Sequence, residues 1–306
     1  MGRHKKEKVE ETVEQIEIVA GQIEQGAAQE DTDEILEFTS YGADVFDLVA
    51  GGGAPFGKVV NLIGDDSVGK SFIASEIVAA ARKKYGKDVD WYYDDAEAGY
   101  SFNSRAIWNF DIITEDMEPS ETIEEFALHV DKCLDKIKPG KKFIYILDSF
   151  DALSSMAELE EFEDKMDAVE NGKAVAGSYG QGKSKGTNQF FRVLVNKIKN
   201  KDCLLVIISQ VRENIGASKW EPKYRRNGGK SLDLYACQIF WLAVAEKYTK
   251  KDTVIGVGVN IKNSKNKAGK PYRGYVCTAV RHQQCPPMWQ TLTSQGTWIM
   301  QEPRDK

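Results

Sequence analysis

The chain has 306 residues, and its 41 Lys and Arg residues against 47 Asp and Glu residues give a formal net charge of −6. Its apolar content of 42% and charged content of 29% are ordinary for a globular protein. No apolar run approaches the ~20 residues that a helix needs to cross a bilayer, and no apolar core follows the charged N-terminus as it would in a secretory signal. We therefore expect neither a membrane protein nor a secreted one.

The charge is distributed unevenly along the chain. Residues 1–40 hold four basic and eleven acidic residues, a net of −7, whereas residues 41–306 have a net of +1. Apolar residues at spacings of three and four predict an amphipathic helix over 8–25, and 26–34 have the composition of a linker. We expect residues 1–35 to be an oligomerisation arm outside the main core, with a frayed, solvated tail as the alternative.

From about residue 38 onward, strand-like apolar runs alternate with helix-like segments. We expect strands over 58–63, 89–93, 142–147 and 203–209, and helices over 71–84, 121–137 and 188–199. This alternation predicts an α/β fold in which a mostly parallel, twisted sheet is flanked by helices. Strand signals without long helices over 236–280 predict antiparallel strands that extend the sheet. The expected core spans 36–281, and 282–306 form a short tail.

Residues 64–71, Gly-Asp-Asp-Ser-Val-Gly-Lys-Ser, fit the phosphate-binding pattern G-x-x-x-x-G-K-[ST] between an expected strand and an expected helix. The glycines let backbone N–H groups wrap around phosphates, and the helix directs its N-terminus at them. Lys70 would reach the β- and γ-phosphates of ATP, and the Ser71 hydroxyl would bind Mg²⁺. The expected ATP-binding residues of this loop are Asp66, Ser67, Val68, Gly69, Lys70, Ser71 and Phe72.

Acidic residues follow two other expected strands, at the sheet edge where the phosphate loop lies. Asp148 follows the strand 142–147 and would hold Mg²⁺ through water, as Walker-B acids do. Hydrolysis also needs a group that orients and polarises the attacking water. Glu97 is the preferred candidate for this general base, with Asp94 and Asp95 as rivals by position alone.

Two stretches have the composition of a surface that binds single-stranded nucleic acid. Residues 172–187 contain three lysines, no acid and many glycines and serines, and residues 212–230 contain six basic and two acidic residues. Cations for phosphates together with aromatic rings for base stacking are typical of single-strand binding. A solvated charged loop is the alternative, but it leaves the aromatic residues unexplained. The expected DNA contacts are Lys173, Lys183, Lys185, Arg212, Lys219, Trp220, Lys223, Tyr224, Arg225, Arg226 and Lys230.

These motifs together resemble those of RecA-type recombinases, over about residues 36–280. Asp95-Ala96-Glu97 matches the family's D-A-E, Asp148-Ser149 its Walker-B D-S, and Lys265-Asn266-Lys267 its K-N-K. Residues 39–64 resemble the segment before its phosphate loop, and 207–212 resemble the segment that leads into its second DNA loop.

The resemblance implies roles for the matching residues. Glu97 would activate water, and Gln210 would sense the γ-phosphate. Lys265 and Lys267 would reach the ATP of a neighbouring subunit. Gly228 and Gly229 would close the second DNA loop and are further expected DNA contacts. The whole would be a RecA-like, single-stranded-DNA-dependent ATPase that forms a helical filament with ATP at subunit interfaces and pairs its strand with homologous duplex DNA.

The chain also departs from the bacterial pattern. Ser71 stands where bacterial RecA has Thr, and Phe102 is the expected substitute for an adenine-stacking tyrosine. About 25 residues follow the core, so we expect the bacterial C-terminal domain to be missing or replaced. This plan resembles phage-encoded recombinases of the UvsX type, in the cytoplasm of a bacterial host. The alternatives are a RecA-fold ring ATPase, helicase-like or KaiC-like, and a nucleotide-binding recombination mediator or annealing protein.

Overall fold

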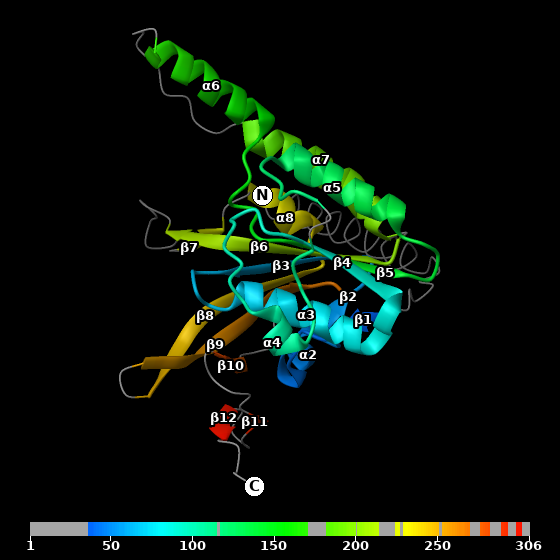
Figure 1. Cartoon of the computed structure of the whole chain (residues 1–306), viewed down its shortest axis with the longest axis vertical. Coiled ribbons are helices and arrows are strands. Elements are labelled where there is room, and N and C mark those ends of the chain that lie inside the picture. The colour runs from blue at the N-terminus through cyan, green and yellow to red at the C-terminus, as the bar shows by residue number, and fades with distance from the viewer. Residues whose placement is uncertain are drawn as a thin grey trace, which may run out of the picture. The chain divides into compact units, whose positions relative to one another are not determined.

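The structure is a computed structural model that describes residues 36–114, 117–170, 182–199, 201–213, 224–226, 229–250, 253–269, 276–281, 289–292 and 298–301. The chain divides into two units, Met1–Leu36 and Glu37–Lys306, and the second is described below (Figure 1). The amphipathic helix expected over 8–25 and the linker after it lie outside the described residues.

An eight-stranded sheet lies at the centre of the second unit, with the order β10-β9-β8-β3-β6-β5-β4 and with β7 paired to β6. Its strands are β3 (Val59–Gly64), β4 (Val89–Asp94), β5 (Lys142–Leu147), β6 (Cys203–Glu213), β7 (Tyr224–Arg226), β8 (Gln238–Lys250), β9 (Thr253–Asn266) and β10 (Val276–Arg281). Adjacent strands within the series β8, β3, β6, β5 and β4 pair in parallel. Strands β9 and β10 extend the sheet from β8 with antiparallel pairing, and β7 is antiparallel to β6. The predicted α/β class and its antiparallel extension are therefore confirmed.

Helices cover both faces of this sheet. The helical elements are α2 (Asp44–Ala50), α3 (Lys70–Tyr85), the 3-10 turn η1 (Gly86–Asp88), α4 (Ser104–Trp108), α5 (Ile123–Lys136), α6 (Met156–Glu170), α7 (Gly182–Lys199) and α8 (Gly229–Tyr235). Helices α2, α3 and α4 lie on one face, and α5, α7 and α8 lie on the other (Figure 1). Within the described residues, no helix combines the length and the apolar character that a membrane span requires.

Strand β3 shows how the sequence produces two buried layers. Its alternate residues point to opposite faces, so Val60 and Leu62 join the core under α3 while Val59 and Ile63 join the core under α5 and α7. All six of its residues are buried, as expected of a central parallel strand. The polar side chain of Asn61 donates hydrogen bonds to Ile207 O and Ser209 Oγ of β6, each at 2.9 Å.

Short two-stranded sheets complete the described chain. The first pairs β1 (Phe38–Thr39) with β2 (Ala54–Pro55), just before the phosphate loop. The second pairs β11 (Trp289–Leu292) with β12 (Trp298–Gln301) and lies within 282–306, the expected short C-terminal tail.

Helix α5 confirms most of the predicted segment 121–137. Thr122 caps its N-terminus, and the reciprocal bonds between Thr122 and Glu125 form a capping box. Phe126 and Val130 are buried, whereas Leu128 is 51% exposed. Leu128 lies off the buried stripe, because residues two positions apart do not share a helix face.

Two other differences change the expected DNA-binding stretches. Helix α7 begins at Gly182 instead of residue 188, so 182–187 are helical and not part of a loop. Strand β6 continues to Glu213 because β7 pairs with its end, which places Arg212 in a strand. Helix elongation adds one hydrogen bond per residue once a first turn exists, which explains how α7 extends through two glycines.

Candidate active site

The loop between β3 and α3 has the backbone geometry of a phosphate cradle. A Cβ atom on Gly64 would lie 2.7 Å from Val68 Cγ1 and 2.9 Å from Leu242 O, so a side chain does not fit there. Ser67 and Gly69 both have positive φ angles, 58° and 95°, and turn the chain into α3. The first N–H groups of a helix lack intrahelical partners and favour anions. The loop therefore presents backbone donors where the sequence predicts phosphates.

Lys70 is folded into this loop. Its Nζ donates to Gly64 O at 3.0 Å and to Asp65 O at 2.8 Å, and the residue is only 8% exposed. Burial lowers the pKa of Lys70, while the carboxylates of Asp148 and Asp66 oppose that shift. The ammonium group thus lies among the atoms that would surround bound phosphate.

The two expected Mg²⁺ ligands meet at one place. The carboxylate of Asp148 accepts a 2.6 Å hydrogen bond from Tyr93 Oη, and the Ser71 side chain lies close enough to lower the pKa of this carboxyl group. Burial nevertheless raises the pKa of Asp148, against the lowering effects of Ser71 and Tyr93. Oxygen donors of this kind suit Mg²⁺, so the residues present fit the predicted metal.

The candidate general base lies beside the predicted γ-phosphate sensor. Gln210 Nε2 donates to Glu97 Oε1 at 2.9 Å, and the Ser149 hydroxyl donates to the same oxygen. Glu97 N donates to Asp148 O at 3.1 Å, which fixes the D-A-E turn to the Walker-B segment. Residues from β4, β5 and β6 are thereby gathered at the carboxyl ends of parallel strands.

The two rival acids are occupied by structural hydrogen bonds. Asp94 is fully buried and accepts bonds from Ser120 and Tyr145. Asp95 accepts backbone N–H bonds from Gly99 and Tyr100 and so closes the turn that carries Glu97. Among the three acids, Glu97 is therefore the best placed to meet an attacking water.

A pocket of about 1020 Å³ extends from the phosphate loop toward the β8–β9 hairpin. Phe72 and Phe102 lie on its wall with ring centroids 5.7 Å apart, so Phe102 occupies a place where it can contact a nucleobase. The opposite wall is mostly apolar and consists of Val211, Tyr224, Trp241, Leu242, Ala243, Val244, Lys247, Val254, Gly256 and Val257. Sequence reasoning missed this wall, because its strand pattern is the same as that of core strands.

Most of the described residues expected to contact DNA lie in strands or helices and not in loops. Arg212 is exposed on β6 and pairs in register with Arg225 of β7, and Tyr224 is 48% exposed beside the pocket. Lys183, Lys185, Gly229 and Lys230 belong to helices. The remaining expected contacts lie outside the described residues: Lys173, Lys219, Trp220, Lys223 and Gly228.

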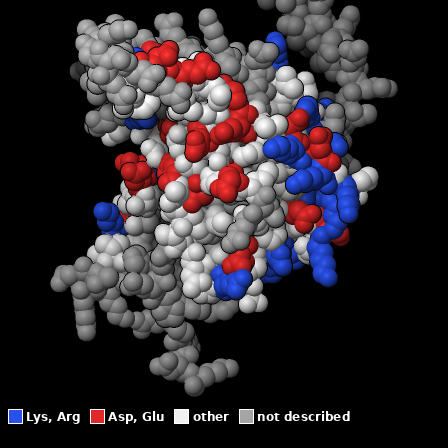
Figure 2. All heavy atoms as spheres, turned by 45° about the horizontal axis from the view of Figure 1, so that its top comes forward, with Lys and Arg blue, Asp and Glu red and all other residues white. Residues whose placement is uncertain are grey.

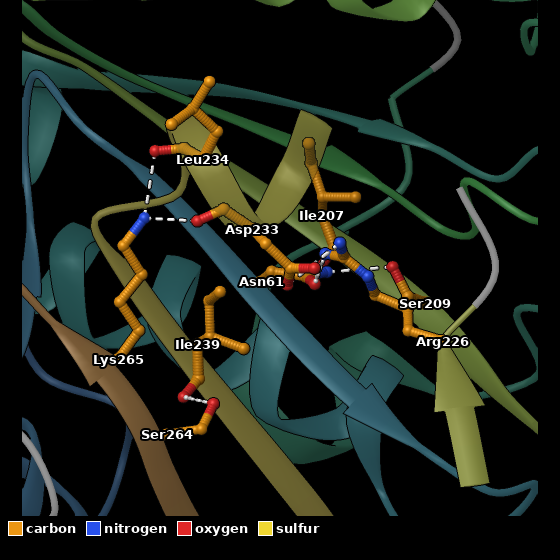
Figure 3. A network of polar contacts seen from close by, with 9 residues as sticks. All are labelled: Asn61, Ile207, Ser209, Arg226, Asp233, Leu234, Ile239, Ser264 and Lys265. Atoms are coloured by element: carbon orange, nitrogen blue, oxygen red, sulfur yellow. Dashed lines mark hydrogen bonds and ion pairs between the residues drawn. The ribbon is translucent and has the colours of Figure 1, made fainter. Parts of the chain in front are cut away.

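Arg226 does not fit the DNA contact predicted for it. Its side chain is 4% exposed, with Nη1 donating to Asn61 Oδ1 at 2.7 Å and Nη2 lying 3.1 Å from Asp233 Oδ1 (Figure 3). Burial lowers the pKa of Arg226, whereas the charges of Asp233 and Asp151 raise it. A guanidinium enclosed in this way has no access to a DNA phosphate.

The K-N-K residues have three different environments. Lys265 Nζ donates to the carbonyl oxygens of Asp233 and Leu234 at the end of α8 (Figure 3). Asn266 is buried and donates to Ala50 O at 2.7 Å, and Lys267 is exposed. Contact of the two lysines with a neighbour's ATP stays a prediction.

The charged side chains of the described surface are separated by sign. Figure 2 shows acidic side chains gathered across the middle of the face in view and basic side chains along one side of it. Opposite local fields therefore coexist within the described residues.

Comparison with known proteins identifies the family. The model of the RecA N-terminal domain matches residues 7–281. The chain belongs to the RecA family. Its curated relatives include proteins named RecA from Clostridium botulinum strains Eklund 17B and Alaska E43, each 28% identical over 240 residues, and from Clostridium acetobutylicum, 28% identical over 239 residues. These alignments cover 78% of this chain but only 62% to 63% of the relatives. The resemblance inferred from the motifs is thus confirmed at the level of the family and its fold.

Proposed function

We propose that this RecA-family protein is a single-stranded-DNA-dependent ATP hydrolase that forms filaments on DNA and promotes homologous pairing and strand exchange. The observation that carries the proposal is the 2.9 Å hydrogen bond between Gln210 and Glu97. It joins the strand that enters the basic segment 212–230 to the candidate general base. Family membership supports nucleotide binding, DNA binding and recombination as the general setting.

Each residue of the site has a distinct task in this proposal. The backbone of the phosphate loop and Lys70 bind and orient the phosphates, and Ser71 and Asp148 would hold Mg²⁺. When bound, Mg²⁺ neutralises charge on the transferred phosphoryl group. Glu97 orients the attacking water and accepts its proton. Phe72 and Phe102 contact the nucleobase at the aromatic wall of the pocket.

Gln210 connects the nucleotide to the DNA. Its backbone N donates to Asp151 Oδ2 at 2.7 Å while its side chain donates to Glu97. A γ-phosphate near Glu97 competes for the amide of Gln210 and shifts the end of β6, which carries Arg212. The exposed Arg212 and Tyr224 then contact the phosphates and bases of a single strand.

Assembly follows from a site shared between subunits. If Lys265 and Lys267 reach the ATP of a neighbour, the nucleotide favours the assembled state by linkage, and hydrolysis weakens it. Residues 1–35 would serve as the arm that contacts an adjacent subunit. We place this activity in the cytoplasm of a bacterial host, in a protein similar to phage-encoded recombinases.

Microscopy with ATP and single-stranded DNA, beside a strand-exchange assay, tests the proposal. We expect helical filaments and ATP-dependent exchange. Closed hexameric rings under the same conditions would instead establish the ring-ATPase alternative. Joining of complementary strands without ATP, with no exchange, would establish an annealing protein or mediator.

A further inference from the structure

Strand β7 is the return strand of the basic segment. Its residues pair antiparallel with the end of β6, in the register Val211 with Arg226, Arg212 with Arg225 and Glu213 with Tyr224. Arg226 is the last residue of β7, immediately before the segment leads to α8. The contacts that hold Arg226 therefore also hold the C-terminal side of the segment expected to contact DNA.

The Arg226 side chain connects three elements of the core. Its guanidinium bonds Asn61 of β3 and Asp233 of α8, and Asn61 in turn donates to Ile207 O and Ser209 Oγ of β6 (Figure 3). Asn61 lies three residues before Gly64, at the start of the phosphate loop. This clasp (Arg226, Asn61 and Asp233) thus ties β7 to the strand that carries the nucleotide site.

The clasp buries a charged group, and this restricts which residue can occupy position 226. A buried charge is unfavourable unless it is paired and hydrogen-bonded, and the 4% exposed guanidinium meets this condition with Asn61 and Asp233. Two acceptors on different elements suit the planar fork of arginine, which a lysine ammonium does not reproduce. The position therefore needs arginine for its shape as well as its charge.

The near end of the segment is held by a neighbouring acid. Asp151 Oδ2 accepts the backbone N–H of Gln210 at 2.7 Å, and its charge also acts on Arg226. The other oxygen, Asp151 Oδ1, is buried and has no hydrogen-bond partner in the described structure. Both ends of the segment are thus held beside the nucleotide site, one through Gln210 and one through Arg226.

We propose that Arg226 is a positioning residue that couples the DNA-binding segment to the phosphate-loop strand. It contacts neither DNA nor nucleotide and acts by holding β7 against β3 and α8. When DNA binding orders the segment, the clasp transmits this change to the nucleotide site. This coupling acts in addition to the one through Gln210. The coupling role rests on the proposed function, whereas the clasp itself does not.

The test compares Arg226→Gln and Arg226→Lys with Arg212→Gln, which alters an exposed arginine in the paired strand. Turnover is measured against single-stranded DNA concentration at several salt concentrations. We expect both Arg226 variants to need about tenfold more DNA for half-stimulation, the effect of one lost charged hydrogen bond, with an unchanged salt slope. Arg212→Gln should reduce the slope by about 0.7, the value for one phosphate contact. A reduced slope in Arg226→Gln would overturn the proposal, as would a loss of thermal stability without any change in DNA dependence.

A second measurement separates the clasp from the proposed function. Amide hydrogen exchange without nucleotide or DNA should show faster exchange over 224–226 in Arg226→Gln, with the β3–β6 ladder still protected. Unchanged exchange there would refute the clasp. If DNA does not stimulate ATP hydrolysis by the wild type, the proposed function and the coupling role are both refuted. The exchange measurement still shows whether the clasp holds β7 in place. If Arg226→Gln does not fold, Asp233→Asn, whose side chain is 60% exposed, takes its place with the same expected outcomes.

Discussion

Substitution of Gly64 by alanine should damage the nucleotide site through a single methyl group. The new Cβ would lie 2.7 Å from Val68 Cγ1, 2.9 Å from Leu242 O and 3.1 Å from Leu242 Cβ. Val68 is fully buried and Leu242 O belongs to the backbone of β8, so neither moves without disturbing its neighbours. Overpacking of this kind costs about 1–3 kcal/mol of folding free energy.

The strain has two measurable consequences. For a domain of this size class, a loss of 1 kcal/mol lowers Tm by roughly 2–4 °C, so we expect a decrease of roughly 2–12 °C. Movement of Val68 also displaces the backbone donors of the loop, and we expect at least about a tenfold loss of nucleotide affinity, or about 1.4 kcal/mol. Thermal unfolding and titration with a fluorescent ATP analogue in the presence of Mg²⁺ measure the two effects.

Gly99→Ala is the matched control. Gly99 lies two residues after Glu97, but its added Cβ would meet only Glu97 Cβ at 3.9 Å, an ordinary contact. We expect it to bind nucleotide as the wild type does. The reasoning is refuted if Gly64→Ala matches the wild type in Tm and in affinity, or if both variants lose affinity equally.

Three further predictions concern polar and charged side chains. Because burial raises the pKa of Asp148, its stabilising contribution is present at low pH and is lost as pH rises above about 4. Asp148→Asn should therefore exceed the wild type in ligand-free Tm by a margin that widens as pH rises from about 4 and levels off above the raised pKa of Asp148, and it should lose Mg²⁺-dependent nucleotide binding. A margin that is the same at every pH would contradict this. Gln238→Leu should cost about 2 kcal/mol or more in urea unfolding, because Tyr41 Oη and Gly53 O each lose a buried partner, while Ala50 O keeps its bond from Asn266. A change within about 0.5 kcal/mol would contradict this. Joint replacement of Lys265 and Lys267 by methionine should reduce ATP turnover and assembly together, and loss of DNA affinity alone would identify them as DNA contacts.

Local motifs made the nucleotide site predictable from the sequence. The phosphate loop, Asp148 and Glu97 each follow a strand, and parallel strands place their carboxyl ends at one edge. The structure brings Ser71 to Asp148 and Gln210 to Glu97, although the last two residues are 113 positions apart. That meeting depends on sheet order, which the strand pattern alone does not specify.

Arg226 shows that the composition of a segment does not predict which of its charged side chains are exposed. A count of charges over 212–230 treats all its arginines alike, yet Arg212 is exposed and Arg226 is enclosed. The difference arises from Asn61, 165 positions away, whose carbonyl oxygen is the acceptor that makes burial of the guanidinium possible. A polar residue inside an otherwise apolar central strand was the available signal for such a partner.

We propose that DNA controls ATP turnover through the Gln210–Glu97 contact. The most direct measurement is the rate of ATP hydrolysis with and without single-stranded DNA, in the wild type and in Glu97→Gln. We predict that DNA raises wild-type turnover, and that Glu97→Gln binds nucleotide but hydrolyses it slowly under both conditions. A wild-type rate that does not respond to DNA, or a Glu97→Gln variant that hydrolyses ATP as fast as the wild type, would refute this mechanism.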